Sequence, residues 1–337
     1  MKRLLIAAVC GLFVFMTGCN AIGSRTEITL GSDYSQTTPA LTTTTPPTEA
    51  TTTTTPPAVT EPLTTTVKLP ENPTVECEIE SPYAAILDVD SGEIVYAKNI
   101  HEKIYPASTT KLLTAITALK YCDSETVFTA GSELELIGPD SSKAFIQTGN
   151  QLTVSQLIDG MMIASGNDAA YILAANTGRL VAMDYEMTAT AAVEYFVSLM
   201  NDVAKEIGME NSNFVTPDGY FDENHYTTVY DMLILANEAI KYEAITTPAS
   251  KPEATTTYVS GQIAQWKNSN ALINQYNEVY SPECTGLKTG FCDEAGYCLI
   301  ATAKSADKNI ITAVFGGEEA SYRWEDSLVL INQGLYS

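Results

Sequence analysis

Histidine and basic residues are scarce in this chain of 337 residues. It has 2 histidines, and its 18 lysines and arginines are outnumbered by 41 aspartates and glutamates, which gives a formal net charge of −23 at pH 7. The negatively charged phosphate backbone of a nucleic acid would repel so acidic a protein. The composition therefore argues against a nucleic-acid partner. Neither His101 nor His225 lies near a cysteine in sequence, so we expect no metal site and no cofactor.

The chain has no hydrophobic run long enough to span a bilayer. The run at residues 4–15 contains 12 residues, follows Lys2 and Arg3, and precedes Thr17, Gly18 and Cys19. This pattern is typical of a secretory signal peptide and resembles the bacterial lipoprotein kind, in which cleavage occurs before an acylated cysteine. We therefore expect a signal peptide over residues 1–18 and a lipid on Cys19. The alternative is an ordinary signal peptide with an accidental cysteine.

Residues 19–75 have little that can form a hydrophobic core. From about residue 31 to residue 73 the sequence is mostly threonine and proline, which predicts an extended, disordered linker. Residues 76–337 are long enough for one large domain. These features predict a domain tethered by its N-terminal lipid to the extracytoplasmic face of a bacterial cell membrane, within the cell wall.

Cysteines are few and odd in number. Without Cys10 and Cys19, five remain: Cys77, Cys122, Cys284, Cys292 and Cys298. Export permits disulfides, and Cys292 and Cys298 flank a predicted turn across which they are candidates to pair. Free thiols are the alternative.

The hydrophobic pattern of the domain predicts a mixed α/β fold, an α+β sandwich. Strands are predicted at 83–88, 93–98, 286–290, 296–303 and 310–315, and helices at 108–121, 153–163, 168–176, 192–207, 230–241 and 322–335. The simplest arrangement is one five-stranded antiparallel sheet flanked by the first and last helices. The middle helices then form an inserted, mostly helical lobe at about 122–280.

Ser108 and Lys111 form the first motif with chemical meaning. On a helix the two side chains share a face, and a neutral lysine there is placed to take the proton of the serine hydroxyl. Burial and a second cation, Lys288, would lower the pKa of Lys111. Ser305 and Lys308 have the same spacing, but they lie in a polar turn before a strand, so context favours Ser108.

Two further strings follow in order. Ser165-Gly166-Asn167 places a hydroxyl and an amide on a tight loop, and capping of the following helix is the alternative reading. Lys288-Thr289-Gly290 supplies a cation, a hydroxyl and a residue without a side chain, which lets a substrate backbone lie close. A turn after a strand would explain Gly290 but not Lys288.

In this order, the three strings resemble the motif set of penicillin-binding proteins and β-lactamases. Segments 106–115, 165–170, 285–290 and 295–297 resemble the serine D-alanyl-D-alanine carboxypeptidase family, the low-molecular-mass penicillin-binding proteins, and the similarity runs from about residue 83 to 335. The resemblance implies the β-lactamase and penicillin-binding-protein fold. Residues from about 179 to 191 look inserted relative to the shorter family pattern.

The resemblance also implies roles for individual residues. Ser108 would form the acyl-enzyme, Lys111 would be the general base and Ser165 would take part in proton transfer. Backbone amides of Ser108 and Phe291 would form an oxyanion hole. The implied substrate-binding residues are Asn167, Lys288, Thr289, Gly290, Phe291 and Arg323. A surface salt bridge to Glu325 or Asp326 is the alternative for Arg323.

These residues together predict a carboxypeptidase that trims the terminal D-alanine from peptidoglycan pentapeptides, with β-lactam antibiotics as covalent inhibitors. A peptidoglycan D,D-endopeptidase or transpeptidase has the same motifs. A class A-like β-lactamase is less favoured, because no Glu-x-x-x-Asn lies between Asn167 and Lys288. A non-catalytic sensor of β-lactams or wall peptides is the remaining alternative.

Overall fold

The computed structural model describes residues 73–337, which lie within one compact unit. The predicted signal peptide, the lipidation at Cys19 and nearly all of the linker lie outside these residues. None of the helices between residues 73 and 337 combines the length and the hydrophobicity that a membrane crossing requires.

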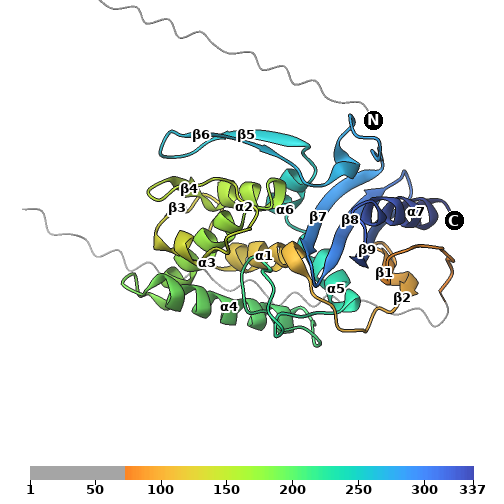
Figure 1. Cartoon of the computed structure of the whole chain (residues 1–337), viewed down its shortest axis with the longest axis horizontal. Helices are drawn as coiled ribbons and strands as arrows, with labels where there is room; N and C mark the ends of the chain where they lie inside the picture. The colour runs from red at the N-terminus through yellow and green to blue at the C-terminus, as the bar shows by residue number, and fades with distance from the viewer. Residues whose placement is uncertain (1–72) are drawn as a thin grey trace, which may run out of the picture. The chain divides into compact units, whose positions relative to one another are not determined.

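A five-stranded antiparallel sheet in the order β2-β1-β9-β8-β7 forms the centre of the domain (Figure 1). Its strands are β1 (Tyr83–Asp88), β2 (Glu93–Lys98), β7 (Cys284–Cys292), β8 (Gly296–Lys304) and β9 (Asn309–Gly317). The predicted sheet is thus confirmed. It joins the two ends of the domain, because Tyr83 of β1 lies opposite Phe315 of β9.

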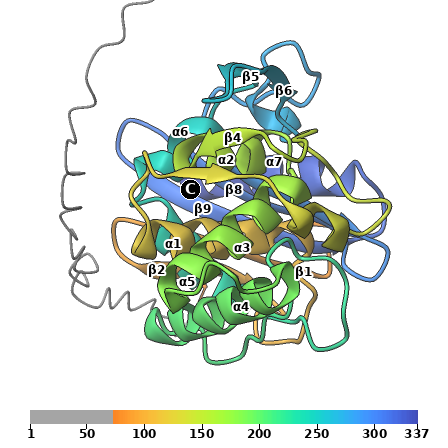
Figure 2. The same cartoon turned by 90° about the vertical axis from the view of Figure 1, so that its left-hand side faces the viewer.

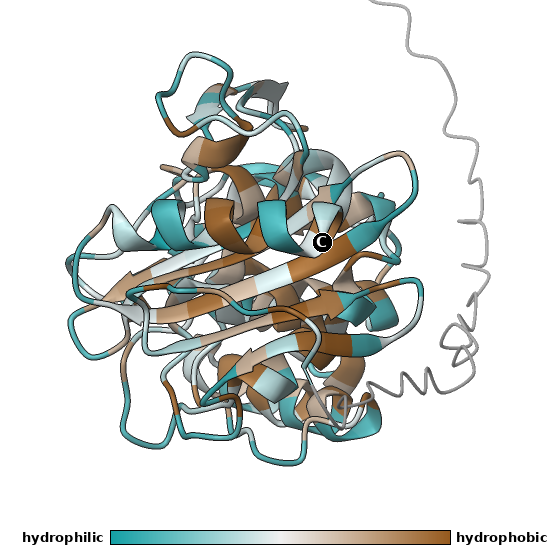
Figure 3. Ribbon diagram, turned by 90° about the vertical axis from the view of Figure 1, so that its right-hand side faces the viewer, coloured by the Kyte–Doolittle hydropathy of each residue, from teal (hydrophilic) through white to brown (hydrophobic). Residues whose placement is uncertain are grey.

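The sheet separates two hydrophobic cores. Along β9, Ile311, Ala313 and Phe315 belong to the larger core on the side of the helical lobe, whereas Ile310 and Val314 belong to the smaller core. Successive side chains point to opposite faces of a strand, so a strand covered on both faces is apolar throughout. Figure 3 shows these largely hydrophobic strands together with the last helix, whose apolar residues complete the smaller core.

Helices occupy most of the middle of the chain and cover both faces of the sheet. They are α1 (Lys111–Tyr121), α2 (Val154–Ile163), α3 (Asn167–Ala182), α4 (Ala189–Glu206), α5 (Val229–Ala239), α6 (Glu243–Ala249) and α7 (Tyr322–Tyr336). The start of α2 follows from its sequence: the Thr153 hydroxyl accepts from the Gln156 amide at 3.1 Å, and the Gln156 side chain accepts from the Thr153 amide.

Short elements that the sequence did not predict interrupt the lobe. They are the hairpin of β3 (Val127–Thr129) and β4 (Gln151–Thr153), the hairpin of β5 (Glu253–Thr257) and β6 (Ile263–Lys267), and the 3-10 helices η2 (Ser132–Leu136) and η3 (Ala271–Ile273). Outside the lobe, the helix predicted at 108–121 begins as the 3-10 helix η1 (Ala107–Thr110) and becomes α-helical at Lys111. In Figure 2 the β5–β6 hairpin lies across the lobe from α4. The lobe is therefore mostly helical, as predicted, but carries two small sheets.

Candidate active site

Ser108 and Lys111 meet at the junction of the lobe and the sheet. Ser108 lies in η1, whose 3-10 geometry places residues three apart directly above one another. Lys111, the first residue of α1, is fully buried, and its Nζ lies 2.8 Å from Ser108 Oγ and 2.9 Å from the backbone carbonyl oxygen of Asp218. The amine is thereby fixed beside the serine hydroxyl.

Burial changes the protonation of this lysine. Loss of solvation lowers the pKa of Lys111 from 10.5 to about 8, although the carboxylates of Asp218 and Asp168 oppose the shift. A second buried lysine, Lys288, has a pKa well below its usual value because of burial and then of its like-charged neighbours Lys111 and Arg323. With a pKa of about 8, roughly a tenth of Lys111 is neutral at pH 7, and this neutral form is the one that a general base requires.

Ser165 lies in the turn between α2 and α3, and Asn167 is the first residue of α3. Ser165 has a φ of 55°, which turns the chain sharply, and its hydroxyl accepts from Lys288 Nζ at 2.9 Å. Asn167 is 5 % exposed, and its Oδ1 is buried without a hydrogen-bond partner in the described part of the chain. An amide oxygen in this state is available to a ligand.

The residues Lys288, Thr289 and Gly290 lie on β7, the edge strand of the sheet. Thr289 Oγ1 is 2.6 Å from Ser269 Oγ, and a Cβ on Gly290 would lie 3.2 Å from the Ala107 side chain and 3.3 Å from the Ser108 amide nitrogen. Any other side chain at this position would crowd η1, so Gly290 favours the close approach of η1 and β7. The free edge of β7 thus runs directly beside Ser108.

Arg323 and Phe291 border the same region. Phe291 is half exposed and stacks on Tyr297 with ring centroids 4.3 Å apart, and the Arg323 guanidinium lies 5.0 Å from the Tyr297 ring. Arg323 forms no ion pair with Glu325 or Asp326 among residues 73–337, and its Nε is buried without a hydrogen-bond partner there. Within the described residues, the guanidinium therefore has no carboxylate partner and lies against the rings of Tyr297 and Trp324.

One cavity of about 500 Å³ brings these groups together. Predicted residues in its lining are Ser108, Ser165, Asn167, Thr289, Gly290, Phe291 and Arg323. The amines of Lys111 and Lys288 lie beneath it, bonded to Ser108 and Ser165 respectively. Every predicted site residue of the domain is thus at or directly under one cavity.

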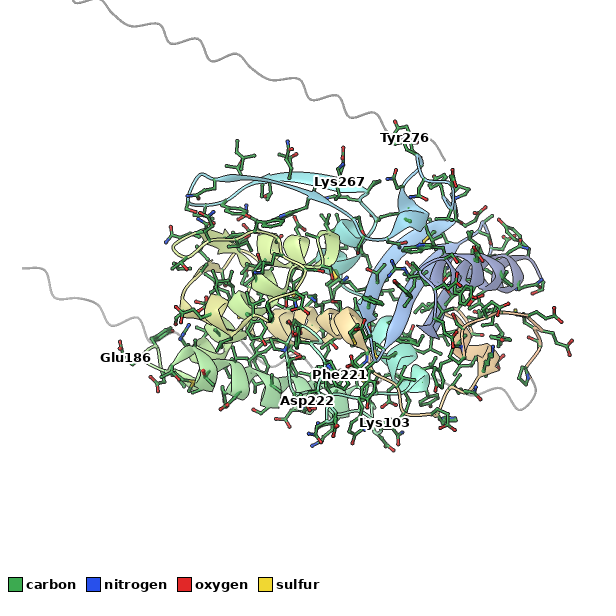
Figure 4. The ribbon with its side chains drawn as sticks, in the orientation of Figure 1. Lys103, Glu186, Phe221, Asp222, Lys267 and Tyr276 are labelled. Carbon is green, nitrogen blue, oxygen red and sulfur yellow. The ribbon has the colours of Figure 1, made fainter. Side chains whose placement is uncertain are left out.

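The sequence did not reveal several other residues of this cavity. Asp218, Tyr220 and Phe221 come from the loop before α5, and Ser269 from the segment before η3. Figure 4 shows Phe221 on that loop, beside Asp222. The one available signal was the Asp218-Gly219 turn: Gly219 has a φ of +83°, and a Cβ there would collide with the Ala107 carbonyl at 1.8 Å.

His225 is buried and contacts η1, the element that carries Ser108. Its Nε2 lies 2.9 Å from Thr110 Oγ1, and burial lowers its pKa from 6.5 to about 4. Within the described residues no three or more His, Cys, Asp and Glu side chains are grouped to hold a metal. All five cysteines between residues 73 and 337 are free, so Cys292 and Cys298 are not paired.

Comparison with known proteins gives a consistent picture. The D-alanyl-D-alanine carboxypeptidase family, peptidase S11, matches residues 66–319. The chain is 34% identical over 256 residues to the D-alanyl-D-alanine carboxypeptidase DacF of Bacillus subtilis, covering 74% of this chain and 61% of that protein. It is 29% identical over 253 residues to the D-alanyl-D-alanine carboxypeptidase of Streptomyces sp. K15, covering 72% of this chain and 83% of that protein.

The same likeness holds for solved structures. The crystal structure of the Streptomyces K15 DD-transpeptidase aligns with a TM-score of 0.70 and 28% identity, over 77% of this chain and 98% of that one. The alignment spans only about three fifths of the Bacillus relative's length, 61%. With the family match over residues 66–319, these likenesses show that the chain belongs to the D-alanyl-D-alanine carboxypeptidase family of serine peptidases.

Proposed function

We propose that this protein is a serine D-alanyl-D-alanine carboxypeptidase that removes the terminal D-alanine from peptidoglycan stem peptides. The observation that carries the proposal is the fully buried Lys111 amine 2.8 Å from Ser108 Oγ, at the edge of the sheet. A neutral amine at this distance is within reach of the hydroxyl proton.

The substrate would extend along the free edge of β7. Main-chain hydrogen bonds to an edge strand hold an extended peptide, and Gly290 leaves room for its backbone. The terminal carboxylate would be bound by the Thr289 hydroxyl and the unpaired Arg323 guanidinium. Asn167 would bind the peptide amide, and the scissile carbonyl would then lie between the backbone amides of Ser108 and Phe291.

The reaction would pass through an acyl-enzyme on Ser108. Ser108 Oγ attacks the carbonyl carbon while its proton moves to Lys111 Nζ, and the C–N bond then breaks. The departing D-alanine takes a proton delivered through Ser165, which Lys288 holds at 2.9 Å. Water hydrolyses the ester and regenerates Ser108. A β-lactam would acylate Ser108 in the same way, because its strained amide takes the place of the D-Ala-D-Ala bond.

The N-terminal region would determine the cellular location of the catalytic domain. A lipid on Cys19 and a linker over residues 19–75 would hold the catalytic domain at the extracytoplasmic face of the cell membrane, within the cell wall. What supports this is the sequence of residues 1–19 and the threonine- and proline-rich composition that follows. Peptidoglycan would then be within reach of the domain.

Release of D-alanine tests the proposed function. The full chain and its Ser108→Ala variant would be incubated with a diacyl-Lys-D-Ala-D-Ala peptide and, separately, with labelled penicillin. We expect release and covalent labelling by the native chain alone. Absence of both from the native chain would refute an active serine enzyme, and labelling without release would point to the cross-link-specific or sensor alternatives.

Transfer to an amine is a second candidate function. It is favoured by the structural likeness to a protein described as a DD-transpeptidase. Hydrolysis and transfer share the acyl-enzyme and differ only in whether water or an amine accepts the acyl group. Adding a glycine-type amine acceptor to the same assay separates them: a new amide product that replaces the shortened peptide would establish transfer.

A further inference from the structure

The charges buried around Lys111 are unevenly partnered. Asp168 from α3, Lys288 from β7 and Asp218 from the loop before α5 face this amine, and Arg323 acts on Lys288 from α7. Lys111 and Lys288 are 0% and 1% exposed, so solvent does little to screen one from the other. The positive charge that forms when Lys111 takes up a proton is therefore stabilised only if an anion lies close by.

Asp168 already uses its carboxylate for the fold. Its Oδ1 accepts from the amides of Ala144 at 2.8 Å and Ala169 at 2.9 Å, and its Oδ2 accepts from the Ile146 amide at 2.9 Å. These bonds hold the loop between η2 and β4 against the first turn of α3. They spread the charge of Asp168 over three backbone donors and leave it a structural group.

Asp218 is different. It is 1% exposed and lines the cavity, and its carbonyl oxygen accepts from Lys111 Nζ. Its Oδ1 accepts from the Tyr220 amide at 3.0 Å, but its Oδ2 is buried with no partner in the described residues. A buried carboxylate oxygen left unbonded is costly and calls for a functional reason.

We propose that the Asp218 carboxylate is the counter-charge of Lys111, stabilising the ammonium that forms when Ser108 gives up its proton. This inference rests on the proposed function. Asp218 is a positioning residue that acts through Lys111: its backbone carbonyl accepts a hydrogen bond from Lys111 Nζ and fixes the geometry, and its carboxylate supplies the charge. It belongs to none of the three sequence motifs.

Asp218→Asn tests the proposal with little change of shape, because asparagine keeps both the backbone carbonyl and an oxygen for the Tyr220 amide. The acylation rate of the full chain with benzylpenicillin would be followed against pH. Removing the anion favours neutral Lys111, so we expect the rising limb to move to lower pH by on the order of one unit. At the high-pH plateau acylation should fall about tenfold, because the ammonium formed in the step loses its counter-charge.

Two variants control this experiment. Glu223→Gln removes an exposed charge from the same loop and should leave the limb in place. Asp218→Glu keeps the charge and should hold the limb near its native position. A limb unmoved in Asp218→Asn overturns the proposal. So does a profile that is scaled down at every pH together with a lower melting temperature, because that marks a purely structural role. Slower breakdown of the acyl-enzyme with unchanged acylation would overturn it too.

Direct titration of Lys111 separates this proposal from the proposed function. Lysine side chains carrying a ¹³C label would be followed by NMR in the full chain, with Lys111→Arg identifying the signal. A lower pKa for Lys111 in Asp218→Asn supports the counter-charge even if the native chain proves inert toward peptide and penicillin. An unchanged pKa refutes it even if the enzyme is active.

Discussion

The Ser-x-x-Lys pattern occurs twice in the domain, once at a buried site and once in a polar turn. Ser108 and Lys111 bond to each other at 2.8 Å under the active-site cavity, and Lys111 is fully buried. Ser305 and Lys308 lie in the turn between β8 and β9, where the Ser305 hydroxyl accepts from the Lys308 amide and the Lys308 amine donates to carbonyls of Gly334 and Ser337. Spacing alone therefore does not bring a lysine amine onto a serine hydroxyl: at Ser108 and Lys111, helical geometry and burial do.

Replacing the two serines should give the largest contrast. Ser108→Ala removes the nucleophile, so we expect D-alanine release and penicillin labelling to fall by more than about 10³-fold. Ser305→Ala removes only local turn contacts and should leave both activities unchanged. Equal losses in both variants, measured at equal melting temperature, would contradict this assignment.

Replacing the two lysines should give a nearly equal contrast. Lys111→Ala removes the base and should reduce acylation almost as far as Ser108→Ala, while the double variant loses no more, because the two residues act as a unit. Lys308→Ala should cost at most about 1 kcal/mol of stability through its contacts at the end of α7. Thermal unfolding and penicillin acylation of each variant measure the two effects.

The region around Ser108 and Lys111 also contacts a buried histidine, because His225 Nε2 lies 2.9 Å from Thr110 Oγ1. The pKa of His225 is about 4 in the fold against 6.5 ordinarily, so the unfolded chain binds this proton first as pH falls. The contribution to stability is complete above pH 6.5 and is lost as pH falls toward 4, by about 3 kcal/mol. Denaturant unfolding between pH 7 and pH 4 checks this, and His225→Gln should flatten that part of the profile.

The exposed His101 provides a matched control for this experiment. His101→Gln should leave the pH dependence of stability as it is in the native chain. If both histidine variants flatten the profile equally, the effect does not come from the burial of His225.

The pH dependence of acylation should show the smallest effect. Lys111 is the proposed base, and because burial lowers its pKa to about 8, its neutral form increases as pH rises through 8. We therefore expect acylation to rise with pH to a plateau above that value, and to lie roughly tenfold below the plateau at pH 7. A rate independent of pH from 6 to 9 would argue against a lysine base.

Local pattern was sufficient for much of the fold. The strands at 83–88 and 93–98 have the predicted bounds, since the turn residues at 90–92 separate them sharply. The helix predicted at 168–176 instead continues to Ala182, because Gly178 is not a stop signal. A Cβ at Gly178 would lie 2.2 Å from the Ala192 carbonyl, so this glycine permits α3 and α4 to pack. The segment at 179–191 accordingly contains the end of α3, the turn between the two helices and the start of α4.

The cavity shows what sequence motifs cannot supply. The three motifs identified Ser108, Ser165 and Lys288, whose chemistry is recognisable from residue type and order. Asp218 and Ser269 reach the same cavity through tertiary packing of loops with no repeating pattern. Their positions depend on contacts such as that of Gly219 with Ala107, which link residues more than 100 positions apart.

The position of β9 in the sheet has a consequence for how the chain folds during its synthesis. β9 is the only strand of this sheet that bridges the N-terminal pair β1–β2 and the C-terminal pair β7–β8. Synthesis proceeds from the N-terminus, so the β1–β2 hairpin has no third strand beside it in the sheet until about residue 317 has been made. Contacts this distant in sequence form slowly. Ser108 therefore comes to lie beside Lys288 and the edge strand β7 only after nearly the entire domain has been synthesised. The proposed active site is consequently incomplete in the growing chain.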